Sequence, residues 1–255
     1  MTIELEKRDD IAILTLNRPR ALNALNSELL RNFADAVKQT GDDGCRALII
    51  TGAGEKAFSA GADVTELVGR TLAREKRTTE LGQRIFNDLE RCPIPTIALV
   101  NGYAFGGGLE LALACTFRLA TPNAKLGLPE IKLGLVPGYG GTQRLPRMIG
   151  HARAMEMILS GEPIGADRAL EFGLVSEIVR GDALEAAAAF ARRFTRHSLV
   201  AGWLARQSVL RGMQTSLEEG LKIEADLSTL SMQTEDGKDG MDAFIAKRPA
   251  RVIDR

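Results

Sequence analysis

The sequence is poor in the residues on which many metal-binding and catalytic sites depend. Its 255 residues include three cysteines, Cys45, Cys92 and Cys115, and two histidines, His151 and His197. The cysteines are odd in number, widely spaced and form no CxxC pattern, which argues against a disulfide framework and a zinc site. Two isolated histidines argue against a histidine-based triad. We therefore expect buried free thiols and no bound metal.

An excess of charge of either sign is also missing. Lys+Arg and Asp+Glu each number 33, so the formal net charge is zero and no general attraction to nucleic-acid phosphates is expected. No apolar run approaches the roughly 18 residues that a membrane span requires. The segment MTIELEKRDD lacks the apolar core of a signal peptide. We therefore expect a cytoplasmic protein with neither a nucleic acid nor a membrane as its partner.

What is present is the patterning of a globular α/β protein. Hydrophobic residues make up 45% and charged residues 26% of the chain, which is ordinary for a soluble enzyme. Buried-strand patterns occur at 11–16, 47–52, 96–100 and 174–179 and alternate with helical patterns. The stretch 64–91 is heavily charged and weakly patterned, and we expect it to be helical with breaks.

The composition changes along the chain. Helical patterns dominate from about residue 142, and every segment beyond 182 has a helical pattern. A change from mixed to all-helical patterning predicts two parts. We expect a core at 1–195 and a helical C-terminal segment at 196–255.

Two glutamates in apolar surroundings are the strongest chemical signal. Glu110 follows three glycines in NGYAFGGGLELALA, and Glu130 lies in KLGLPEIKLGLVPGYGGTQRL. A buried carboxylate is costly without a partner or a task, and burial raises its pKa toward the range useful for proton transfer. The alternative for Glu130 is an acidic residue in the first turn of a short helix begun by Pro129, where the helix dipole favours it.

The glycines beside Glu110 predict exposed backbone amides. Gly107 stands where a strand passes into a helix, so its amide lacks an intrahelical partner and no Cβ shields it. The turn SAGAD (59–63) has the same small-residue character. The amides of Ala62 and Gly107 could therefore converge on one carbonyl oxygen as an oxyanion hole. The alternative is that the glycines serve only tight packing of helix on strand.

Six segments occur in an order that is characteristic of one family: NRPRALNAL, FSAGAD, NGYAFGGGLELALACTFRLA, LPEIKLGLVPGYGGTQRL, GLVSEIV and GMDAFIAKR. In these segments the chain resembles the enoyl-CoA hydratase/isomerase (crotonase) superfamily, and most of all an enoyl-CoA hydratase, from about residue 10 to 248. The resemblance implies an α/β fold, a crotonase-like spiral of β-β-α units. It also implies a helical C-terminal segment that mediates assembly into homotrimers or homohexamers.

The resemblance also implies site residues. The two catalytic carboxylates fall on Glu110 and Glu130, and the oxyanion-hole amides fall on Ala62 and Gly107. The implied substrate-binding positions, at the coenzyme A groove, the attacking water and the coenzyme phosphate, are Arg20, Ala21, Leu22, Ala60, Gly138 and Lys247.

The implied activity is the hydration of a 2-trans-enoyl-CoA to a 3-hydroxyacyl-CoA, as in fatty acid β-oxidation. Both glutamates hold one water, Glu110 takes its proton and Glu130 protonates the α-carbon. The implied reaction needs no metal or redox cofactor. Coenzyme A enters as part of the acyl-CoA substrate.

Several alternatives stay open. Within the superfamily, a Δ3,Δ2-enoyl-CoA isomerase or a specialised acyl-CoA hydratase would carry similar motifs. From a different class, a coenzyme-A- or RNA-binding scaffold without turnover is opposed by the two intact glutamates and the zero net charge. The length of the acyl chain is also open. Tyr139, between two glycines, is compatible with either a wall of the pocket or a packing residue.

Overall fold

A computed structural model describes the backbone of residues 1–255 and every side chain except that of Asp42. The chain forms two compact units, Met1–Ala189 and Phe190–Arg255. Helix α7 (Ala183–Thr195) crosses the boundary between them. The division into a core at 1–195 and a C-terminal segment at 196–255 stays a prediction.

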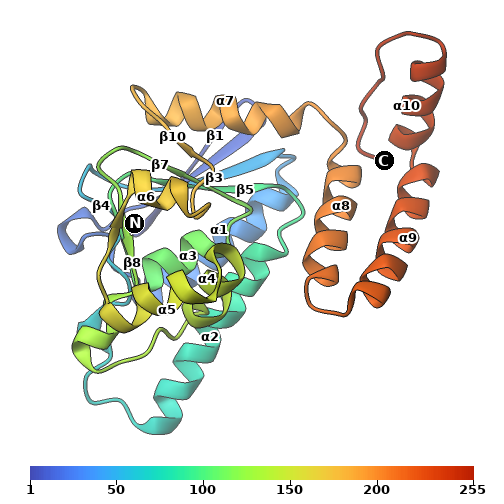
Figure 1. The fold of residues 1–255 in the computed structure, drawn as a ribbon. Helices are drawn as coiled ribbons and strands as arrows, with labels where there is room; N and C mark the ends of the chain where they lie inside the picture. The colour runs from blue at the N-terminus through green and yellow to red at the C-terminus, as the bar shows by residue number, and fades with distance from the viewer. The chain divides into compact units, whose positions relative to one another are not determined.

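The N-terminal unit is built on two β-sheets (Figure 1). The first has six strands in the order β1-β2-β3-β5-β7-β10, and only the β1–β2 pair is antiparallel. The second has four strands in the order β4-β6-β8-β9, with β9 antiparallel to β8. The strands are β1 (Ile3–Arg8), β2 (Ile11–Leu16), β3 (Ala47–Gly52), β4 (Ala57–Ser59), β5 (Thr96–Val100), β6 (Tyr103–Phe105), β7 (Phe117–Ala120), β8 (Lys125–Gly127), β9 (Ile164–Gly165) and β10 (Glu177–Ile178).

Successive pairs of strands build the two sheets together. The pairs β3 and β4, β5 and β6, and β7 and β8 each give one strand to the first sheet and the next to the second. A helical segment follows each pair. This repetition confirms the predicted spiral of β-β-α units. Strands β3 and β5 are buried along their whole length, which explains why their sequences are continuous apolar runs.

The helices of this unit pack partly against the strands and partly against one another. Helices α1, α2 and α3 lie side by side (Figure 1), and α3 packs against strands of both sheets. Asn26 and Thr71 cap α1 and α2 by accepting hydrogen bonds from the amides of Leu29 and Arg74. The helical segments are η1 (Pro19–Ala21), α1 (Ser27–Asp42), η2 (Val64–Glu66), α2 (Leu72–Glu90), α3 (Gly107–Ala114), η3 (Pro129–Leu133), α4 (Gly141–Ile149), α5 (His151–Ser160) and α6 (Ala166–Glu171).

One predicted element agrees with the structure and another differs from it. The stretch 64–91 contains the 3-10 helix η2 and the separate helix α2, as expected for a helical stretch with breaks. The strand predicted at 174–179 covers only β10 (Glu177–Ile178) in the structure. The amides of Leu174 and Val175 instead donate to the carbonyl of Ala169 near the end of α6. Both side chains are buried, so their apolar character reflects packing rather than a longer strand.

The C-terminal unit is helical, as the sequence predicts. It contains α8 (Leu199–Gly212), α9 (Leu217–Gln233) and α10 (Glu235–Ile245), and α9 packs against both of the others. The buried carboxylate of Asp236 accepts hydrogen bonds from the amides of Ile253 and Asp254 at 2.7 and 3.0 Å, which ties the end of the chain to α10. No helix among the described residues has the length and apolar character needed to cross a membrane.

Candidate active site

A cavity of about 350 Å3 in the N-terminal unit brings together most of the predicted site residues. Much of the rest of its wall is apolar. It therefore has the usual character of a small-molecule site, with a few polar groups in an apolar surface. The predicted residues in its lining are Ala60, Ala62, Gly107, Glu110, Glu130 and Gly138.

The glycines at the start of α3 allow close packing and leave space beside the cavity. Gly106 has φ 50°, and a Cβ there would lie 2.8 Å from Oε1 of Glu130. A Cβ on Gly108 would collide with the carbonyl oxygen of Ser59 in β4. Gly108 is therefore required for close packing of helix on strand, and Gly106 leaves space beside the Glu130 carboxyl group.

Two residues with free backbone amides, Ala62 and Gly107, lie close together in the lining of the cavity. A Cβ on Gly107 would lie 3.4 Å from the amide nitrogen of Ala62. The turn that carries Ala62 is held on both sides of it, because Leu25 donates to Gly61 at 2.8 Å and accepts from Asp63 at 3.1 Å. Among the described residues, neither the Ala62 nor the Gly107 amide donates to a protein acceptor. Both are therefore available to a ligand oxygen.

Glu110 is buried in the first turn of α3, with 1% of its surface exposed. Its Oε1 accepts hydrogen bonds from the amides of Tyr139 and Gly141 at 2.8 and 2.7 Å. Burial raises the pKa of Glu110 to about 7 and the negative charge of Glu130 adds to this rise, although the two amides and Arg144 oppose it. A carboxyl group with this pKa can accept or donate a proton near neutral pH.

Glu130 approaches the cavity from η3, which begins at Pro129 as predicted. Burial raises the pKa of its carboxyl group, partly opposed by a hydrogen bond from its own amide. Its Oε2 is buried and has no hydrogen-bond partner among the described residues. Such an atom is costly to leave unsatisfied, and it is a natural acceptor or donor for a molecule in the cavity.

The remaining predicted positions do not line this cavity. Arg20, Ala21 and Leu22 lie exposed in and just after η1. They are connected to the cavity indirectly, because the carbonyl of Leu22 accepts from the amide of Ala60 at 2.9 Å. Lys247 lies in the C-terminal unit, just after α10, with φ 52°.

Sequence reasoning missed the residues that hold Glu110. The amides of Tyr139 and Gly141 bind its carboxylate, and Arg144 donates to the carbonyl of Tyr139 at 3.2 Å. Arg144 also donates to Asn87 at 2.6 Å. The sequence places Tyr139 between two glycines, but only the folded structure reveals which carboxylate this segment contacts.

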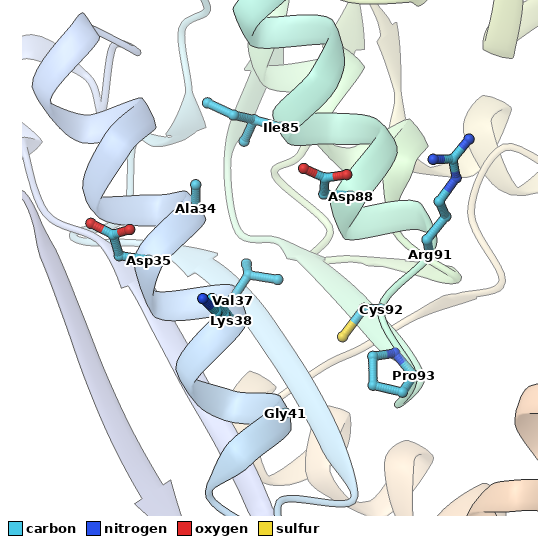
Figure 2. Close-up of a pocket in the computed structure, with 10 residues that line it drawn as sticks. All are labelled: Ala34, Asp35, Val37, Lys38, Gly41, Ile85, Asp88, Arg91, Cys92 and Pro93. Carbon is cyan, nitrogen blue, oxygen red and sulfur yellow. The ribbon is translucent and has the colours of Figure 1, made fainter.

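A second hollow, of about 560 Å3, lies between α1 and the end of α2 (Figure 2). Val37 and Ile85 reach into the space between the two helices, and the buried Cys92 lies beyond them (Figure 2). The charged residues that line this second hollow, such as Asp35 and Asp88, are exposed. It is larger than the first cavity but holds no buried carboxyl group, so the smaller cavity is the better candidate site.

Among the described residues, no cluster of three or more His, Cys, Asp or Glu side chains is suited to hold a metal.

The sequence matches the model of the enoyl-CoA hydratase/isomerase family over residues 6–255. It is 42% identical to the crotonyl-CoA hydratase of Syntrophomonas wolfei, over 99% of this chain and 98% of that protein. It is also 42% identical to the short-chain-enoyl-CoA hydratase of Clostridium acetobutylicum, over 96% of this chain and 94% of that protein. The crystal structure of the enoyl-CoA hydratase from Bacillus anthracis aligns over 100% of both chains, with 37% identity and a TM-score of 0.94.

The chain therefore belongs to the enoyl-CoA hydratase/isomerase family. The predicted family, the crotonase-type fold and the expectation of an enzyme are confirmed. The roles of the individual site residues stay predictions, and they are taken up as proposals below.

Proposed function

We propose that this protein adds water across the double bond of a 2-trans-enoyl-CoA to form a 3-hydroxyacyl-CoA. The proposal rests chiefly on one observation. Two carboxyl groups with raised pKa and two amides without acceptors line the same cavity. The names of the hydratases that this chain resembles support the same reaction.

In this proposal the amides of Ala62 and Gly107 donate to the thioester oxygen. As the oxygen of a water molecule bonds to the β-carbon, the electron pair of the double bond moves toward the thioester, and the oxyanion gains negative charge. Preorganised donors are worth about 2.7–4 kcal/mol each in such sites. The two amides would therefore act mainly on the transition state.

The two glutamates divide the proton transfers. Glu110, ionised at the start, takes a proton from the attacking water, and Glu130, protonated at the start, gives a proton to the α-carbon. One water molecule is consumed, and the proton gained by Glu110 balances the proton lost by Glu130. Because the two carboxyl groups interact, their resting protonation is a property of the pair. The unpaired Oε2 of Glu130 is a suitable atom to carry the transferred proton.

The remaining predicted contacts belong to this proposal too. Arg20, Ala21, Leu22 and Ala60 would line the path of the coenzyme A group, and Gly138 would lie near the attacking water. Lys247 would approach the coenzyme phosphate. Coenzyme A enters as part of the substrate, and no separate cofactor is proposed. We further propose a role in fatty acid β-oxidation, a cytoplasmic location and assembly as a homotrimer or homohexamer.

Ultraviolet absorbance separates the competing functions. A hydratase removes the absorbance of the conjugated thioester in crotonyl-CoA, whereas an isomerase creates that absorbance from a 3-enoyl-CoA. We expect the purified protein to remove the absorbance of crotonyl-CoA. Loss of the double bond without formation of 3-hydroxybutyryl-CoA would contradict the proposal. Binding of coenzyme A without any change in absorbance would instead favour a scaffold.

A further inference from the structure

Tyr139 occupies a slot between two helices beside the proposed reaction centre. Only 8% of its surface is exposed. A Cβ on Gly82 of α2 would lie 2.5 Å from two carbons of the Tyr139 ring, and a Cβ on Gly107 of α3 would lie 3.2 Å from a third. The ring also packs edge to face on Phe86, with centroids 5.6 Å apart. The absence of side chains at Gly82 and Gly107 is therefore what leaves room for the ring.

The same residue separates two hollows. Tyr139, Ala62 and Leu67 line both the cavity of about 350 Å3 and a hollow of about 10 Å3. The smaller hollow is lined in part by Leu25 and Leu30 of the packed interior. Tyr139 therefore forms a wall between the cavity and the interior beyond it, and a smaller side chain would join the two spaces.

Charged groups lie on the far side of this wall. Ser27, Glu66 and Arg70 also line the smaller hollow. The hydroxyl of Ser27 donates to Glu66 at 2.6 Å, and Arg70 pairs with Glu66 and Glu75 at 3.3 Å each. Nε of Arg70 is buried without a hydrogen-bond partner among the described residues. An apolar chain that reached this cluster would remove charged groups from their polar surroundings at a cost in free energy.

The wall stands where an acyl chain would continue past the reacting carbons. The Tyr139 ring borders Gly107, whose amide would bind the thioester oxygen, and its own amide donates to Glu110, which would lie at the β-carbon. Carbons beyond the β-carbon therefore approach the ring. The cavity volume of about 350 Å3 is near the lower end of the ~300–1,000 Å3 common for small-molecule sites.

We propose that Tyr139 closes the inner end of the acyl pocket and restricts the enzyme to short acyl chains such as crotonyl. This inference rests on the proposed hydratase function and adds its substrate class. Tyr139 acts here as a residue that determines specificity. Burial raises the pKa of its hydroxyl to about 12, so the hydroxyl stays neutral near neutral pH, and the proposed mechanism assigns it no proton transfer.

The test compares kcat/KM for 2-enoyl-CoA substrates of four, six and eight acyl carbons. We expect the unmodified protein and Tyr139→Phe to prefer four carbons, since both keep the ring. In Tyr139→Leu and Tyr139→Ala, the ratio of six-carbon to four-carbon kcat/KM should rise about tenfold or more, because one accommodated methylene is worth ~10–200-fold. Circular dichroism checks that each variant is folded, and Tyr139→Leu supports the test if the Ala variant is unstable.

The matched control is Leu159→Ala on α5, which shortens an apolar side chain that is 61% exposed and lies outside the lining of the cavity. This control should leave the ratio of six-carbon to four-carbon substrates unchanged. The proposal is overturned if the unmodified protein hydrates eight-carbon and four-carbon substrates equally well. It is also overturned if the folded Leu and Ala variants keep the original ratio.

Measurements of ligand binding distinguish a failure of this inference from a failure of the proposed function. Dissociation constants of butyryl-CoA and hexanoyl-CoA, which lack the double bond, need no turnover. We expect hexanoyl-CoA to gain at least about tenfold in affinity relative to butyryl-CoA when Tyr139 becomes Ala. A protein that hydrates none of the substrates would overturn the proposed function, yet this change in relative affinity would still decide the role of Tyr139.

Discussion

Glu110 connects the stability of the protein to its proposed chemistry. Its carboxyl group is buried beside Glu130, and its pKa rises from the ordinary 4.5 to about 7. The folded protein therefore retains a proton on Glu110 at pH values where the unfolded chain has released it. Stability from the protonated form is complete below about pH 4.5 and is lost as the pH rises through about 7.

This linkage predicts a pH-dependent difference between the unmodified protein and Glu110→Gln. The interval between the two pKa values corresponds to roughly 3 kcal/mol of unfolding free energy. Relative to the Gln variant, whose side chain does not titrate, the unmodified protein should lose about this amount between pH 4.5 and 7.5. Urea unfolding at several pH values measures the difference. A difference that stays constant across this range would show that Glu110 does not titrate as inferred.

The two carboxyl groups also predict large kinetic effects. Glu110→Gln and Glu130→Gln keep the shape of each side chain but remove its ability to exchange a proton. Each should lower kcat for crotonyl-CoA by about 10²–10⁴-fold. Steady-state assays of the two folded variants measure the loss. Glu156→Gln, which changes an exposed carboxylate on α5, serves as the control, and near-normal turnover in either site variant would remove that residue from the mechanism.

At the scale of elements, helix α4 and the loop before it hold the Glu110 carboxylate in place. Arg144 of α4 donates to the carbonyl of Tyr139, and it also pairs with Glu90 of α2 at 3.2 Å. The loop in turn donates to Glu110 through the amides of Tyr139 and Gly141. Helices α2, α3 and α4 therefore meet through one hydrogen-bonded connection, and the guanidinium charge lowers the pKa of Glu110.

Replacing Arg144 by Met should therefore change the pH profile. Without the positive charge the pKa of Glu110 rises, so the pH at which kcat/KM reaches half its maximum should move upward. Turnover at neutral pH should fall as well, because the loop loses an anchor. The matched control is Arg147→Met on the same helix, since exposed Arg147 donates to Gln143 alone within the described part of the chain. Equal pH midpoints in the two variants would count against this role of Arg144.

At the scale of the whole molecule, the C-terminal unit carries apolar side chains that its own fold leaves exposed. Phe244 and Ile245 on α10 are 86% and 79% exposed, and Leu221 and Leu230 on α9 are more than half exposed. Exposed apolar surface of this kind marks sites of association. This observation agrees with the proposed assembly of several copies of the chain.

Light scattering tests the assembly directly. We expect a particle with three or six times the 27.5 kDa chain mass. Because apolar contacts are insensitive to salt screening, the mass should stay the same at high ionic strength. A monomer at micromolar concentration would refute the proposed trimer or hexamer, and a dimer would require a different arrangement.

The sequence predicted much of the site because its motifs are local. Gly106 to Gly108 and Glu110 are nearly adjacent in the chain, so the pattern of glycines and acids indicates their chemistry directly. The strands β2, β3 and β5 were predicted with the bounds that the structure has, because each is a continuous buried apolar run. The very short strands β4 and β6 lack such a pattern and become strands through pairing in the second sheet, β4 with β6 and β6 with β8.

By itself, the sequence determined the family, the spiral fold and the pair of glutamates, because these depend on residue types at short spacings. Tertiary structure alone decided how the site is held and closed. Glu110 meets the Tyr139 amide 29 residues away and the Gly141 amide 31 residues away, and the Tyr139 ring rests on Gly82 of a different helix. Such contacts depend on how the spiral brings distant segments together, and no local pattern records that arrangement.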